Sequence, residues 1–191
     1  MFNAKSSGVD NVSSALTART GSSEGMKAGG VFHVQCLDKD GNLKWETSEH
    51  NLVVNQGLQD MNTKYFKGSS YTAAWFLGLV TGPGSGTTFA AADTLASKAW
   101  TEFTNYSGSR KSVTFGTATT ADPSVIDNSA SPSAFTISGA GGTVAGAFLC
   151  SVASGTSGIL FSESDFQSPG DRVVVSGDTL NVTYTFSLDA A

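Results

Sequence analysis

The sequence predicts an all-β protein, a β-sandwich or jelly-roll-like domain with one short helix and an extended N-terminal arm. Charged residues make up only 14% of the chain, which is low for a helical bundle. Glycine is abundant, with 22 residues, as expected where many turns join short strands. The run 179–188 alternates large apolar residues with Asn, Thr and Ser, a period of two that is typical of a strand with one buried face.

We divide the chain into an extended N-terminal arm, residues 1–30, and a β-sandwich body, residues 31–191. The arm has few large apolar residues among its Ser, Thr, Gly and Ala, so it cannot offset its own ordering entropy and should be disordered in isolation. Gly29-Gly30 is a plausible hinge between the two parts. We expect the arm to be held by a partner. Its candidate partner-binding residues are Phe2, Val9, Val12 and Leu16.

The first half of the body is predicted to begin with a hairpin. Residues 31–37 form a strand with one face fully apolar, the polar connection 38–42 contains the turn signal Asp40-Gly41, and residues 43–47 return. Residues 55–66 carry Leu58, Met61 and Tyr65 at helical spacing and predict a short helix that ends near Gly68. The apolar run 72–80 predicts a strand buried on both sides.

The second half is predicted to be a series of short strands. Residues 89–103 are ambiguous, with a helical turn possible early and a strand at the end, and residues 110–120 alternate as a strand. Asp122-Pro123 starts a turn. Further β runs, separated by Gly, Ser or Asp, cover 133–139, 143–152, 158–162, 172–176 and 179–188. This spacing is typical of sandwiches and barrels.

Composition limits the partners. With a net charge of −5 and an isoelectric point near 4.8, the chain has no basic stripe to release counterions, so we expect no nucleic-acid partner. No run approaches the length of a membrane span, and the N-terminus lacks the apolar core of a signal peptide. We therefore expect assembly in a cytosol, where Cys36 and Cys150 stay reduced and buried as small apolar residues.

No motif for catalysis or for a cofactor stands out, and we predict neither a metal site nor an enzyme. Residues 38–49 imitate a calcium loop, but the sixth position is Leu43 instead of glycine, so a hairpin turn is the better interpretation. The glycine-rich run 82–86 lacks the Lys-Ser/Thr ending of a phosphate loop. His33 and His50 have no ligand cluster around them in sequence. Scattered carboxylates leave open an acid pair formed by two loops: Asp122, Asp127, Glu163, Asp165, Asp171 and Asp178.

Four segments occur in an order that resembles a family of small structural proteins of tailed bacteriophages. They are GNLKWETSEHNLVVNQGLQDMNTKYFKGSSYTAAWFLGLV (41–80), AADTLASKAWTEFTNYS (91–107), AFTISGAGGTVAGAFLCS (134–151) and SGDTLNVTYTFSL (176–188). The similarity extends from about residue 31 to residue 188, so the arm lies outside it. The family has no catalytic motif to carry over. Its members are described as decoration, head or tail proteins, and the resemblance therefore implies a component of the virion.

Within that class, the expected function is a capsid decoration (cement) protein that binds and stabilises the outer shell. Its partners would be the major capsid protein and other copies of itself. The alternative is a tail or head fibre component that recognises a host receptor, which exposed loop aromatics would favour. Tyr71, Trp75 and Trp100 lie in or beside apolar runs, which indicates core positions instead. A polysaccharide-degrading virion enzyme would usually need a longer, repetitive chain.

Overall fold

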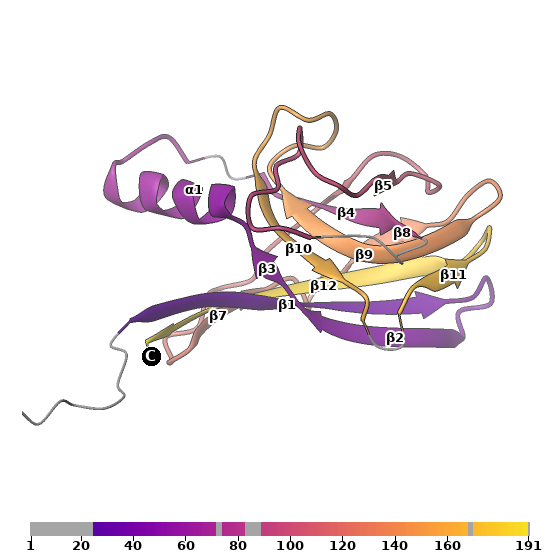
Figure 1. Cartoon of the computed structure of the whole chain (residues 1–191). Coiled ribbons are helices and arrows are strands. Elements are labelled where there is room, and N and C mark those ends of the chain that lie inside the picture. Colours follow the sequence, from indigo (N-terminus) through magenta and orange to yellow (C-terminus); the bar gives the residue numbers. More distant parts are fainter. Residues whose placement is uncertain (1–24, 72–73, 83–88, 168–169, 191) are drawn as a thin grey trace, which may run out of the picture.

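The structure is a computed structural model that describes residues 25–71, 74–82, 89–167 and 170–190. In these ranges the chain forms two antiparallel sheets, packed face to face, and one short helix at one end of the sandwich (Figure 1). The all-β, sandwich-like prediction is therefore confirmed. The helix, α1 (Asn55–Phe66), has the predicted bounds.

The first sheet, sheet A, has the order β2-β1-β12-β7, and β8 also pairs with β12. Its strands are β1 (Met26–Leu37), β2 (Leu43–His50), β7 (Ser124–Asp127), β8 (Ser133–Thr136) and β12 (Thr179–Ala190). The two longest, β1 and β12, pair along their whole length, from Met26 opposite Ala190 to Leu37 opposite Thr179. The first and last strands of the body thus form the centre of sheet A.

The second sheet, sheet B, has the order β3-β10-β9-β4-β5, with β11 on β9 and β6 on β4. Its strands are β3 (Leu52–Val53), β4 (Phe76–Thr81), β5 (Glu102–Phe103), β6 (Lys111–Ser112), β9 (Gly142–Cys150), β10 (Leu160–Asp165) and β11 (Arg172–Val174). The chain crosses from sheet A to sheet B directly after His50, so α1 follows a strand of sheet B.

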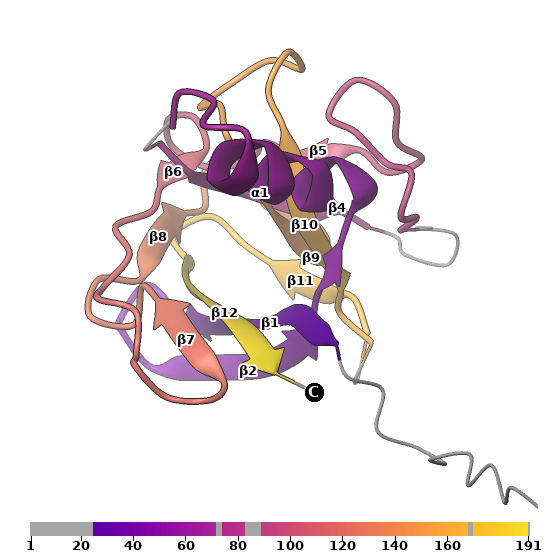
Figure 2. The same ribbon diagram turned by 90° about the vertical axis from the view of Figure 1, so that its left-hand side faces the viewer.

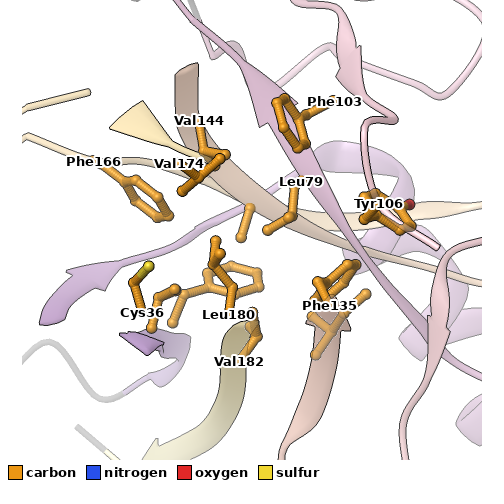
Figure 3. Packing of buried hydrophobic residues seen from close by; sticks show 14 of the residues in the cluster. Cys36, Leu79, Phe103, Tyr106, Phe135, Val144, Phe166, Val174, Leu180 and Val182 are labelled. Atoms are coloured by element: carbon orange, nitrogen blue, oxygen red, sulfur yellow. The ribbon is translucent and has the colours of Figure 1, made fainter. Parts of the chain in front are cut away.

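The main core lies between the sheets (Figure 3). Alternate residues of β12 point into it, and Leu180, Val182 and Tyr184 are fully buried, as the period of two predicts. Opposite them, β1 contributes Phe32 and Val34. The Phe32 and Tyr184 ring centroids lie 4.7 Å apart.

A second apolar cluster covers the outer face of sheet B. Phe148 on β9 packs against Trp100, with ring centroids 4.8 Å apart, and Leu95 is buried in the same cluster. The segment 89–101 that supplies Leu95 and Trp100 contains turns and bends but no helix, and only Glu102–Phe103 is a strand. This cover explains why β4 is apolar on both sides, as predicted.

Several strand boundaries differ from the prediction, and two of the differences are large. β1 begins at Met26, so Gly29 and Gly30 are strand residues and the expected hinge between arm and body at this point is wrong. Gly30 serves a close approach, since a Cβ there would lie 2.3 Å from the carbonyl oxygen of Thr185 on β12. The strand placed at 110–120 is limited to β6.

The rest of 110–120 leaves sheet B and crosses to sheet A. The amide of Val113 donates to the carbonyl of Trp75, and the amide of Gly116 donates to that of Asp127 on β7. A segment that passes from one sheet to the other changes its hydrogen-bond partner on the way. The alternating sequence therefore does not form a continuous β-strand. The sequence pattern does not predict strand β7, which directly follows Asp122-Pro123.

Candidate protein-interaction surface

Helix α1 is fixed at its N-terminal end to the edge of sheet B. Gly57 lies against β10 so closely that a Cβ would be 2.4 Å from the carbonyl oxygen of Phe161. The amide of Val54 donates to the same oxygen at 3.1 Å, and the amide of Leu160 donates to Gln56 Oε1 at 2.9 Å. These contacts involve only the first turn and the residue before it, so the remaining turns project beyond sheet B.

Sheet A continues beneath this projecting part of α1. The face of β1 and β12 that carries the core residues continues past the core toward the ends of these strands. Its residues there are Met26 and Ala28 on β1 and Phe186 and Leu188 on β12. Figure 1 shows α1 and the start of β1 at the same end of the sandwich, and Figure 2 views that end directly, with α1 above the strands of sheet A. The inner face of sheet A is therefore longer than sheet B can cover.

The space between α1 and the extended part of sheet A is a groove lined mainly by apolar side chains. It consists of hollows of about 610, 450 and 180 Å³, and Met61 lines all three. The smallest hollow reaches inward to Trp75, Phe161 and Tyr184. We call the three together the α1 groove; apolar residues on its walls include Met26, Leu58, Met61, Tyr65, Phe186 and Leu188.

Large apolar side chains surround the α1 groove and remain exposed. Their exposed fractions are 84% for Tyr65, 75% for Phe66, 69% for Tyr71, 66% for Met26 and 41% for Leu58. The expectation that Tyr71 is a core residue is wrong, whereas Trp100 is buried and Trp75 packs against the core. Exposed apolar patches on soluble proteins often belong to interaction sites, so the α1 groove and its surroundings are a candidate interaction surface.

The helical spacing of Leu58, Met61 and Tyr65 predicts the helix correctly. Met61 packs partly against the main core, whereas Leu58 and Tyr65 are exposed on the walls of the α1 groove. The spacing therefore marks an apolar face of α1 but does not by itself identify the groove. The four proposed partner-binding residues, Phe2, Val9, Val12 and Leu16, lie outside the described residues. Their predicted role stays a prediction.

The hairpin turn at 38–42 and the two histidines, which the sequence offers as candidate metal ligands, have structural roles or lie exposed in the structure. Asp38 Oδ1 accepts hydrogen bonds from the amides of Asp40 and Asn42, both at 2.9 Å, so residues 38–42 form the predicted hairpin turn. His33 Nδ1 lies 2.8 Å from Ser48 Oγ on the neighbouring strand, and His50 is exposed. Most of the glycine-rich run 82–86 lies outside the described residues. Elsewhere in the described chain, no three His, Cys, Asp or Glu side chains gather as metal ligands.

One carboxyl group has a strongly changed environment. Glu163 on β10 is fully buried, and burial is the main cause that raises its pKa to about 8. Trp100 Nε1 donates to its Oε2 at 2.8 Å, and the amide of Ala90 donates to its Oε1 at 3.2 Å. Asp93 also accepts from the Ala90 amide, at 3.2 Å. These bonds attach the segment 89–101 to sheet B.

A polar hollow of about 360 Å³ adjoins Glu163 and is also lined by His50 and Asp165. Glu163 shows no exposed surface there, and both its oxygens already accept hydrogen bonds. Burial, followed by the charge of Asp171, raises the pKa of Asp165. The geometry gives Glu163 a role in holding the covering segment in place.

Two ion pairs use further charged residues structurally. Arg110, buried beside Phe148, donates from Nε and Nη2 to both carboxylate oxygens of Glu102 at 2.8 and 2.7 Å. Lys44 Nζ pairs with the buried Asp178 at 2.5 Å. Each pair ties a strand to a neighbouring turn or segment, which satisfies a charge that would otherwise be costly to bury.

The two cysteines are free and buried, as predicted, and they lie on different sheets. Burial raises the pKa of the Cys36 thiol to about 11 and also raises that of Cys150. Both thiols are therefore protonated at neutral pH and poor nucleophiles.

Among the described residues, no helix is both long and apolar enough to cross a membrane. The geometry thus gives two results: an exposed apolar groove beside the start of β1, and buried polar groups that are engaged in holding the fold. Comparisons with protein-family models, curated proteins and solved structures find no match to this chain.

Proposed function

We propose that this protein is a bacteriophage virion structural protein, assembled in the host cytoplasm, and more specifically a capsid decoration (cement) protein. The observation that carries the proposal is the exposed apolar surface around the α1 groove, placed where the N-terminal arm joins the body. The resemblance of residues 31–188 to phage structural proteins supplies the class. The proposed partners are the major capsid protein and other copies of this chain, and the proposed role involves no catalysis or cofactor.

The energetic argument is additive. Burying ~400 Å² of apolar surface would contribute on the order of 10 kcal/mol before ordering costs, which remove much of it. The rings of Tyr65 and Phe66 already lie against each other, with centroids 4.9 Å apart, so a partner would meet a partly ordered aromatic surface. A modest gain for each copy, repeated over a shell, would resist the pressure of packaged DNA.

The test uses particles that lack this protein. We expect them to assemble and package DNA but to lose it at lower temperature than complete particles. Adding the purified protein back should restore heat resistance and saturate as sites fill. A Phe66→Ser/Tyr71→Ser variant should need a higher concentration to restore heat resistance. The control Val173→Ser/Val175→Ser, which changes exposed valines on or beside β11, should behave as the unaltered protein.

The exposed aromatics also favour a second candidate, a tail or head fibre component that recognises a host receptor. Tyr65, Phe66 and Tyr71 are the kind of exposed residues that such a module would use. This candidate makes a different forecast, because particles without the protein would resist heat normally and fail to adsorb to cells. That outcome would replace the decoration proposal.

A further inference from the structure

The α1 groove separates two apolar surfaces that ordinarily would pack on each other. Above it, Leu58, Met61 and Tyr65 form the apolar stripe of α1, and below it Met26 and Leu188 continue the inner face of sheet A. In the described residues nothing fills the space between them. Met61 packs partly against the main core, but three hollows of this size between apolar walls leave Leu58 and Tyr65 exposed, without the contacts that the apolar face of an amphipathic helix normally makes.

The arm supplies a matching stripe. Val9, Val12 and Leu16 follow the spacing i, i+3, i+7, so a helix over these residues would place all three on one face. On α1, Leu58, Met61 and Tyr65 have the same spacing. Eight helical residues span about 12 Å, which fits beneath the roughly 18 Å of a 12-residue helix such as α1.

The connection between the arm and the groove has a suitable length. Met26 is both the first residue of β1 and part of the groove wall, so residues 1–25, the part of the arm before β1, join the body at the groove itself. Residues 17–25, nine residues rich in Gly, Ser and Thr, separate Leu16 from Met26. A connection of this composition has a mean span of about 15–18 Å, so the arm of the same chain is present at an effective concentration of the order of millimolar.

We propose that the α1 groove is the docking site for the arm of the same chain, with Val9, Val12 and Leu16 packed against Met61 and Leu188. The arm is too poor in apolar residues to fold alone, and the groove supplies the apolar surface that it lacks. Three of the four predicted anchor residues then bind the body, whereas Phe2 and the exposed rings of Phe66 and Tyr71 stay available to an external partner. The inference goes beyond the proposed function, since it holds for the free protein whether or not the chain is a virion component.

Disulfide trapping in the full-length protein tests the docking. The variant Leu16→Cys/Met61→Cys should form an intramolecular disulfide under mild oxidation at least tenfold faster than Ser14→Cys/Met61→Cys, because Ser14 lies off the stripe. The buried, protonated native thiols will not compete. Equal rates for the two pairs would overturn the proposal. Disulfide-linked dimers in place of linked monomers would also overturn it, in favour of docking into a second copy.

A dye that binds exposed apolar surface provides a second measurement. The variant Val9→Ser/Val12→Ser/Leu16→Ser should bind 8-anilinonaphthalene-1-sulfonate several-fold more than the unaltered protein, since the groove would be uncovered. The control Ser13→Ala/Ser14→Ala should not. Circular dichroism establishes that each variant keeps its β structure. Unchanged dye binding in the triple variant would contradict the proposal.

Discussion

Trp100 Nε1 donates a 2.8 Å hydrogen bond to Glu163 Oε2, and this bond joins the segment that covers the outer face of sheet B to strand β10. Both residues are buried. A buried indole N–H requires an acceptor, and a buried carboxyl group requires donors, so each satisfies the other. Because Trp100 belongs to the second apolar cluster and Glu163 can lose a proton, the stability of this cluster should depend on pH.

The folded-state pKa of Glu163, about 8, lies above the ordinary glutamate value of 4.5 that applies in the unfolded chain. Between these values the folded state keeps a proton that the unfolded state loses. This contribution to the free energy of unfolding is therefore complete below about pH 4.5 and is lost progressively as pH rises to about 8. Glu163→Gln should flatten the fall in stability from pH 5 to 8, as measured by urea denaturation at several pH values. Glu46→Gln, an exposed control, should leave the slope unchanged.

Gly57→Ala should destabilise the protein although alanine is the better helix former. Alanine at an interior helical position gains up to about 1 kcal/mol. Its Cβ would lie 2.4 Å from the carbonyl oxygen of Phe161, and moving α1 to relieve the overlap should cost roughly 1–3 kcal/mol. We expect a lower Tm by differential scanning calorimetry. Gln59→Ala, on the exposed side of the same helix, is the control. A Tm for Gly57→Ala above that of Gln59→Ala would show that α1 can move away from the Phe161 carbonyl at little cost in stability.

Val182→Asp should prevent folding, and Asn181→Asp should be tolerated. Val182 is fully buried opposite Val34, so a carboxylate there would have no water or partner. Asn181 lies on the other face of β12, opposite Gln35, where most substitutions change stability by about 0.5 kcal/mol or less. Expression of soluble protein and its far-ultraviolet circular dichroism measure the contrast. Equal yields of the two variants would mean that the two faces of β12 are assigned wrongly.

Two truncations should have different effects. Removing residues 1–24 leaves every described strand intact and should preserve the β structure. Removing residues 1–30 also deletes five residues of β1, including Gly30, whose carbonyl accepts from the amide of Asn51, and leaves the end of β12 without its partner. The longer truncation should therefore unfold at a lower denaturant concentration. Identical midpoints for the two would indicate that the β1 extension contributes nothing.

Three elements can be predicted from local sequence patterns. They are β12, from its alternation of apolar and polar residues; the turn 38–42, from Asp40-Gly41; and α1, from its apolar spacing. The same spacing does not reveal what an apolar stripe faces. Leu58, Met61 and Tyr65 form the stripe that a core-facing helix would have, yet they line a groove because α1 projects beyond sheet B. Likewise, Tyr71 was expected in the core from its apolar neighbours, but its exposure depends on where the chain leaves α1.

The pairing of Glu163 with Trp100 could not be predicted, because 63 residues separate them and no local pattern marks either as a partner. Strand β7 was missed for a similar reason. Its four residues are ordinary in sequence, and they become a strand because β12 extends far enough to offer Thr185–Leu188 as partners. Tertiary pairing of this kind decides short strands more than intrinsic preference does.

The placement of Cys36 and Cys150 has a consequence for the surroundings in which the protein can persist. Cys36 is buried in the main core and Cys150 in the second apolar cluster, and both thiols are protonated at neutral pH. Oxidants and thiol reagents therefore have little access to either sulfur. The fold depends on no disulfide between them. A change from reducing to oxidising surroundings should therefore neither form nor break a disulfide in this protein. The integrity of the fold rests on packing and hydrogen bonds, which do not depend on the redox state of the surroundings.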